Sequence, residues 1–167
     1  VNATSLVESA MEEIRILEDM NFYDMKISVK SSDVNTMIDA YRKLSDLVDY
    51  PLHLGVTEAG PLYQALVKSS IGIGSLLKDG IGDTIRVSIT GDPVEEVKAA
   101  KTILKSLNLS HDGLDIVSCP TCSRTTVNLE EIVAEVEEKA AGLGIDAKIA
   151  IMGCPVNGPG ESKEADY

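Results

Sequence analysis

Three cysteines are the residues whose type and spacing most clearly suggest chemistry. Cys119 and Cys122 form a C-x-x-C pair, and Cys154 follows in the Gly/Pro-rich segment 153–161. The pair puts two thiolates on one tight turn, and the third cysteine leaves one coordination position for another ligand. An iron–sulfur cluster, which usually takes four cysteines, is compatible with this spacing. A structural zinc site with three cysteines and one other ligand is equally compatible.

The composition of the chain excludes several classes of partner. A net charge of −12 over 167 residues argues against nucleic acid, whose binding needs a basic surface. No apolar run approaches the ~20 residues of a membrane span, and no signal peptide opens the chain. An odd number of cysteines without a secretory signal indicates cytoplasmic thiols or metal ligands. Because the chain opens at Val1, without a methionine and within a helical pattern, we expect it to be part of a longer protein.

The elements that must position these cysteines alternate between short apolar strands and amphipathic helices. Strands are predicted at residues 26–30, 52–58, 84–90 and 114–118, with helices around 37–48, 64–77 and 92–107. Strands separated by helices predict right-handed βαβ units and a parallel sheet. Gly72 and Gly74 make the later part of the second helix uncertain.

The character of the chain changes after the C-x-x-C pair. Asn128 and Glu131 predict the capped start of a strongly acidic helix. A further strand at residues 147–152 leads into the loop of Cys154. We therefore expect a domain boundary near Ser118–Cys119.

Polar side chains gather at the carboxyl ends of the predicted strands, where parallel α/β folds place their chemistry. The residues concerned are Lys30, Thr57, Glu58, Arg86, Ser88 and Cys119. Taken singly, each could be an ordinary polar group at a strand end. Together they favour a metal-dependent enzyme. His53, within a strand, is interpreted as a core histidine bonded to the backbone.

Five segments of the chain, in this order and spacing, resemble the 4-hydroxy-3-methylbut-2-enyl diphosphate synthase family. They are I-S-V-K-S-S-D-V, Y-P-L-H-L-G-V-T-E-A-G-P, G-D-T-I-R-V-S, C-P-T-C-S-R-T and M-G-C-P-V-N-G-P-G-E. The resemblance covers essentially the whole chain, and the two cysteine segments are highly specific in combination.

The resemblance implies a fold and a cofactor. Residues 1–118 would be the C-terminal half of a TIM (β/α)8 barrel, and residues 119–167 a small α/β iron–sulfur domain. The family holds a [4Fe–4S] cluster with three cysteines and a glutamate, which correspond here to Cys119, Cys122, Cys154 and Glu161. A carboxylate is a more labile ligand than a thiolate, so it can yield its iron to substrate oxygen.

The resemblance also implies an activity, the reductive ring opening of 2-C-methylerythritol 2,4-cyclodiphosphate to 4-hydroxy-3-methylbut-2-enyl diphosphate in isoprenoid biosynthesis. Lys30 and Arg86 would bind the cyclic diphosphate, Thr57 and Ser88 would add hydroxyl contacts, and Glu58 would be the catalytic carboxylate. Ferredoxin or flavodoxin would donate electrons, and the enzyme would be a cytoplasmic homodimer. The alternative is a non-catalytic α/β binding module stabilised by zinc.

Overall fold

A computed structural model of the chain describes residues 2–140, 143–156 and 158–167. The chain forms two compact units, Val1–Leu107 and Asn108–Tyr167, which are described one at a time.

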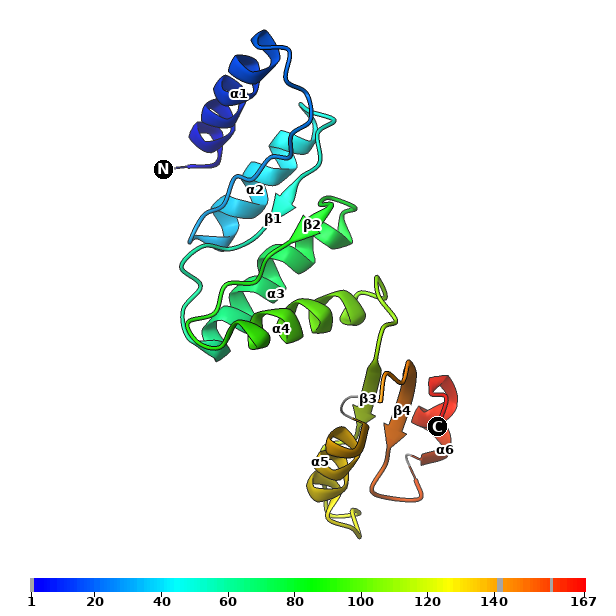
Figure 1. The fold of residues 1–167 in the computed structure, drawn as a ribbon. Coiled ribbons are helices and arrows are strands. Elements are labelled where there is room, and N and C mark those ends of the chain that lie inside the picture. The colour runs from blue at the N-terminus through cyan, green and yellow to red at the C-terminus, as the bar shows by residue number, and fades with distance from the viewer. Residues whose placement is uncertain (1, 141–142, 157) are drawn as a thin grey trace. The chain divides into compact units, whose positions relative to one another are not determined.

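Four helices form the first unit together with short extended segments (Figure 1). The helices are α1 (Ala3–Asp19), α2 (Val34–Ser45), α3 (Leu62–Lys78) and α4 (Pro93–Ser106). Side-chain oxygens cap the starts of α2 and α4, since Asp33 accepts from the backbone of Thr36 at 2.7 Å and Asp92 from that of Val94 at 2.9 Å. The helix start predicted at Asp92 is therefore confirmed.

Three extended segments between these helices pair in parallel. Strand β1 (His53–Leu54) pairs with β2 (Thr84–Ile85), and an isolated bridge joins Ile27 to Leu52. The predicted α/β class with parallel pairing is confirmed, but the regular ladders are shorter than the predicted strands. Among the described residues the segments do not close into a barrel, and no strand pairs with the other edge of the segment around Ile27.

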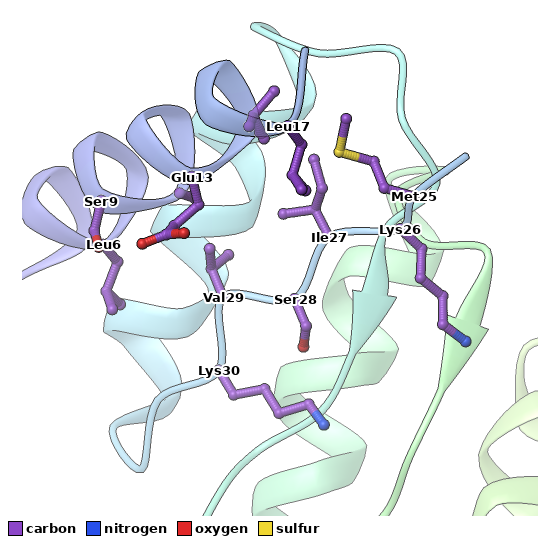
Figure 2. A pocket seen from close by; sticks show the side chains of 12 residues that line it. Leu6, Ser9, Glu13, Leu17, Met25, Lys26, Ile27, Ser28, Val29 and Lys30 are labelled. Carbon is purple, nitrogen blue, oxygen red and sulfur yellow. The ribbon is translucent and has the colours of Figure 1, made fainter. Parts of the chain in front are cut away.

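The segment 25–30 shows how the pleat divides apolar from polar side chains. Figure 2 shows Ile27 and Val29 on one side of the segment and Ser28 and Lys30 on the other. Ile27 and Val29 are buried, whereas Ser28 is exposed. Because alternate residues of an extended chain point to opposite faces, the sheet has one apolar and one polar face.

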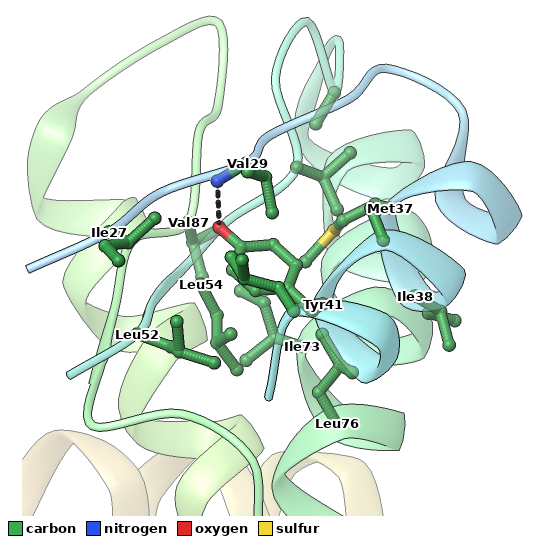
Figure 3. Packing of buried hydrophobic residues seen from close by; sticks show 14 of the residues in the cluster. Ile27, Val29, Met37, Ile38, Tyr41, Leu52, Leu54, Ile73, Leu76 and Val87 are labelled. Atoms are coloured by element: carbon green, nitrogen blue, oxygen red, sulfur yellow. Dashed lines mark hydrogen bonds between the residues drawn. The ribbon is translucent and has the colours of Figure 1, made fainter. Parts of the chain in front are cut away.

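The apolar face packs against the helices to form the core of the first unit (Figure 3). Its fully buried side chains include Met37, Leu44, Leu54, Val56, Ile73, Leu76 and Val87. Tyr41 of α2 lies among them, and its hydroxyl accepts a hydrogen bond from the backbone of Val29 at 3.1 Å and donates one to the carbonyl of His53 at 2.5 Å. Tyr41 therefore ties two neighbouring extended segments together from within the core.

Helix α3 continues through the two glycines that made its end uncertain. A Cβ at Gly72 would lie 2.9 Å from Val56 Cγ2 and 3.2 Å from Met37 Sδ. The missing side chain lets α3 approach the sheet closely, and this contact compensates the low helix propensity of glycine.

The second unit is built on a parallel pair of strands, β3 (Leu114–Ser118) and β4 (Ala147–Ile151), in register from Leu114–Ala147 to Ser118–Ile151. Helix α5 (Leu129–Ala140) connects them, and α6 (Gly158–Glu161) and a 3-10 turn (Ser162–Glu164) follow. The predicted cap of α5 is confirmed, because Asn128 Oδ1 accepts from the backbone N–H of Glu131 at 3.4 Å, and the Asn128 amide also donates to the Glu131 carboxylate at 2.9 Å.

Strand β3 belongs to this second unit through its pairing with β4. The observed division at Leu107–Asn108 thus comes before β3, whereas the sequence suggested a boundary after it. The assignment of domains 1–118 and 119–167 stays a prediction for the longer protein.

Candidate active site and metal centre

The polar face of the sheet in the first unit carries a concentration of basic and hydroxyl side chains. Alternation along the three extended segments assigns to it Lys26, Ser28, Lys30, His53, Gly55, Thr57, Thr84, Arg86 and Ser88. The intervening residues, such as Leu54 and Val87, are buried against the helices. A sheet face with this composition suits an anionic ligand.

The Lys30 side chain lies over Gly55 of the middle segment, and its charge interacts with that of Arg86 from the third segment. A Cβ at Gly55 would lie 3.2 Å from Lys30 Cε and 2.9 Å from the backbone oxygen of Arg86. Partial burial, followed by the charge of Arg86, lowers the pKa of Lys30 below its ordinary value. Within the described part of the chain, no carboxylate forms an ion pair with either side chain.

Ser88 is held by Arg86. The Arg86 guanidinium donates to Ser88 Oγ from Nε at 3.2 Å and from the terminal nitrogen Nη2 at 2.7 Å. The two side chains, predicted to contact substrate together, therefore lie side by side at the end of one extended segment. Their role in binding stays a prediction.

Thr57 and Glu58 lie at the carboxyl end of the middle segment. The Thr57 backbone donates to the carbonyl of Ser31 at 3.2 Å, which extends the parallel pairing toward this end. Glu58 is exposed and has a φ of 52°, in the left-handed region that disfavours side chains with a Cβ. Strained backbone of this kind is found most often at functional sites.

His53 lies at a different place from the one that the sequence predicted. It is half-buried on the polar face, and its ring Nδ1 lies 2.7 Å from the hydroxyl oxygen of Thr84. The interpretation as a core histidine bonded to the backbone was therefore wrong. Burial, and then the charges of Lys30, Lys26 and Arg86, lower the pKa of His53. The sequence did carry a signal for this placement. His53 lies two residues before Gly55, and alternate residues of an extended segment share one face, so both lie on the polar face.

A groove of about 370 Å³ lies between α1 and the segment 25–30 (Figure 2). Leu6, Ala10 and Leu17 of α1 line one side of it. Lys30 also lines the groove, whereas Arg86 and Glu58 do not, so the groove adjoins the cationic site over Gly55 on one side only.

In the second unit, parallel pairing brings the two cysteine segments to the same end of the sheet. Cys119 follows β3 directly, and Cys154 lies shortly after β4. The carboxyl ends of the two strands are aligned, because Ser118 pairs with Ile151. The backbone of Thr126 donates to the carbonyl of Gly153 at 3.2 Å, which joins the two loops. All three cysteines are present as thiols.

Arg124 lies beside Cys122 and was not assigned a role from the sequence. Hydrogen bonds from its backbone and side chain lower the pKa of Cys122, which favours the thiolate. The guanidinium also interacts electrostatically with Cys154 and Cys119. Arg124 is part of the segment C-P-T-C-S-R-T, but its role could not be seen in the sequence. The fold of the turn brings its side chain back toward Cys122.

The donor set fits an iron–sulfur cluster in its chemistry. Three thiols are available, and the charge of Arg124 favours the negative form of their sulfur. Among the described side chains, no three potential ligands are close enough together to hold a metal ion. The predicted fourth ligand, Glu161, is in α6, and its side chain lies outside the described residues.

No helix in the described ranges is long and apolar enough to cross a membrane.

Comparison with known proteins gives one consistent result. Residues 1–101 match the GcpE TIM-barrel domain, and residues 115–167 match the GcpE protein C-terminal domain.

Highly similar bacterial proteins carry the name 4-hydroxy-3-methylbut-2-en-1-yl diphosphate synthase (flavodoxin). The chain is 61% identical to that of Fusobacterium nucleatum over 163 residues, covering 98% of this chain and 46% of the relative. It is 57% identical to that of Clostridium tetani, covering 99% and 48%, and 52% identical to that of Geobacter sulfurreducens, covering 98% and 46%. The chain thus spans about half the length of the curated relatives it matches.

Proposed function

The chain belongs to the GcpE family, and on this premise we propose that it is the C-terminal part of an iron–sulfur oxidoreductase that opens the ring of 2-C-methylerythritol 2,4-cyclodiphosphate. The resemblance recognised in the sequence is confirmed by the family match. The product would be 4-hydroxy-3-methylbut-2-enyl diphosphate, as the name of the relatives states.

The observation that carries the proposal is the Lys30 side chain over Gly55, close enough to Arg86 for the two positive charges to interact. Two cations without a described carboxylate partner favour a multiply charged anion, and phosphate oxygens accept charge-assisted hydrogen bonds. Arg86 also orients the Ser88 hydroxyl, which would add a contact to the same diphosphate. Thr57 would contribute a second hydroxyl from the neighbouring segment.

Glu58 is the catalytic residue of the proposal. It lies at the carboxyl end of the middle segment, beside the place where Lys30 and Arg86 would hold the diphosphate. Its carboxylate would handle a proton during ring opening, and its strained backbone would fix the direction of the side chain.

Cys119, Cys122, Cys154 and Glu161 would hold the cofactor. When bound, a [4Fe–4S] cluster supplies electrons one at a time for reductive ring opening. The Arg124 guanidinium and the lowered pKa of Cys122 keep sulfur in the thiolate form that binds iron. Flavodoxin is the proposed electron donor, because the names of the relatives include it.

The remaining parts of the proposal concern the longer protein. The groove beside α1 would receive a neighbouring strand of the TIM barrel, since it runs along the edge of the segment 25–30 that no strand in the described part of the chain occupies. The enzyme would be a cytoplasmic homodimer.

The test is an anaerobic absorption spectrum of the full-length protein with iron, sulfide and zinc analysis, followed by turnover of the cyclodiphosphate. We expect a broad band near ~400 nm and about four irons per chain. Lys30→Gln should raise KM, whereas Lys26→Gln, at the other end of the same segment, should leave it unchanged. A colourless protein that contains stoichiometric zinc after anaerobic reconstitution would contradict the proposal.

A further inference from the structure

We infer that Thr125 and Gly153 form a matched pair that couples the Cys119–Cys122 turn to the Cys154 loop, with Thr125 as a positioning residue of the cluster site. The inference rests on the proposed function in one respect only, the identity of the metal group. The coupling itself concerns contacts within the second unit.

Thr125 is bonded to Cys122 at three points. Its hydroxyl oxygen accepts a hydrogen bond from the Cys122 backbone at 3.1 Å, and its backbone N–H donates to the Cys122 carbonyl at 3.0 Å. The hydroxyl group also lies 4.0 Å from Cys122 Sγ, at the limit for a donor to sulfur. Side chain and backbone of one residue thus fix the turn that presents this thiolate.

The same side chain contacts the second cysteine loop through its methyl group. A Cβ at Gly153 would lie 2.7 Å from Thr125 Cγ2, too close for any real pair of carbons. The other near neighbours of that Cβ would lie at ordinary distances, with Thr125 Oγ1 at 3.5 Å and Leu129 Cδ2 at 3.6 Å. The conflict at Gly153 is therefore with a single methyl group.

The adjacent backbone bond reinforces this contact. Thr126 donates to the carbonyl of Gly153 at 3.2 Å, and Gly153 is buried immediately before Cys154. The position of Cys154 relative to Cys122 is thus set by how closely the Thr125 methyl group sits against Gly153.

Two effects on a bound cluster follow. The Thr125 hydroxyl is a hydrogen-bond donor toward a ligand sulfur, and such donors stabilise the reduced, more negative cluster and raise its potential. The close contact with Gly153 sets how near the two cysteine loops approach each other, and supporting groups of this kind strengthen metal binding.

Four variants of the full-length holoenzyme separate these effects: Thr125→Val, Thr125→Ser, Gly153→Ala and the double variant Gly153→Ala/Thr125→Ser. Two readouts are compared with wild type under anaerobic conditions, the midpoint potential of the cluster and the rate at which iron is lost to a chelator.

Thr125→Val keeps the volume and removes the hydroxyl, so the midpoint potential should fall while the cluster is retained. Thr125→Ser keeps the hydroxyl and should retain the wild-type potential. Gly153→Ala should weaken metal retention by roughly 10-fold. The double variant should recover it, because the serine lacks the methyl group that the new Cβ would strike.

A wild-type potential in Thr125→Val, or a double variant that loses iron as fast as Gly153→Ala, would overturn the inference. If the wild-type protein builds no cluster, the proposed function fails and the coupling is tested with Co²⁺, whose thiolate charge-transfer bands report binding. Weaker Co²⁺ binding in Gly153→Ala with recovery in the double variant supports the coupling, and equal affinities in all variants overturn it.

Discussion

The side chain of Lys30 lies across Gly55, with Lys30 Cε 3.2 Å from the position that a Cβ at residue 55 would occupy. The same Cβ would lie 2.9 Å from the backbone oxygen of Arg86, so any side chain at residue 55 must push this backbone aside and press on the Lys30 side chain. This relationship gives the first prediction.

Gly55→Ala should destabilise the protein by about 1–3 kcal/mol, because a buried Cβ forces backbone to move. It should also weaken binding of the cyclodiphosphate by separating Lys30 from Arg86. Urea unfolding and calorimetric titration of the full-length protein measure the two effects. Gly74→Ala is the matched control, since a Cβ there meets nothing within 4 Å and should stabilise α3 by up to about 1 kcal/mol. Unchanged stability and binding in Gly55→Ala would contradict the assignment.

Tyr41→Phe should cost about 1–3 kcal/mol of unfolding free energy, because it leaves the buried N–H of Val29 without its acceptor. The carbonyl of His53 loses a donor at the same time. Chemical denaturation measures the loss. Tyr63→Phe removes a hydroxyl from a side chain that is 83% exposed and should change stability little. Equal stabilities of the two variants would show that the Tyr41 bonds are not needed.

Glu58→Asn should separate stability from activity. Asparagine tolerates the left-handed backbone better than glutamate, so unfolding free energy should rise by roughly 1 kcal/mol. Turnover should fall by about 100-fold or more if the carboxylate handles a proton. Denaturation and steady-state kinetics on one preparation measure both. Retained turnover would remove Glu58 from the mechanism.

The His53 ring should make stability depend on pH near neutrality. Its pKa in the folded protein lies below the ordinary 6.5, so the unfolded chain binds the proton more readily. The stabilisation is therefore complete above pH 6.5 and is lost as the pH falls through the lower folded pKa. Urea midpoints at about pH 7.5 and about pH 5.5 should differ less in His53→Gln than in wild type.

A bound diphosphate should reverse the direction of this shift. A polyanion beside Lys30 and Arg86 offsets the positive field that disfavours a protonated His53 ring, so the pKa of His53 should rise. An NMR titration of the ring protons with and without inorganic pyrophosphate measures it. An unchanged titration curve would show that the anion binds away from this face.

Much of the fold could be predicted because hydrophobic alternation is a local signal. The segments around Ile27, Leu54 and Val87 are extended and buried on alternate residues, as their patterns indicate. The length of each ladder could not be predicted, since it depends on neighbouring strands. The continuity of α3 depends likewise on the contact of Gly72 with Val56, which lies in a different element.

The partner of β3 was beyond the reach of local patterns as well. The strand Leu114–Ser118 is recognisable in the sequence, yet only its register with β4 shows which sheet it joins. In the metal site the cysteines were conspicuous by type and spacing. Arg124 and Thr125 were not, because ordinary polar residues acquire a role only when a turn folds them back on a sulfur.

One edge of the segment 25–30 has no pairing strand among the residues that the structure describes, which has a consequence for handling the protein. Exposed backbone donors and acceptors along a strand are a template for another polypeptide, and natural proteins protect such edges by covering them or by charge. Lys26 and Lys30 give this segment like charges that repel a second copy, an effect that salt screens. As it stands, this chain should therefore aggregate more readily at high ionic strength, and a covering strand supplied in the same polypeptide should suppress that aggregation.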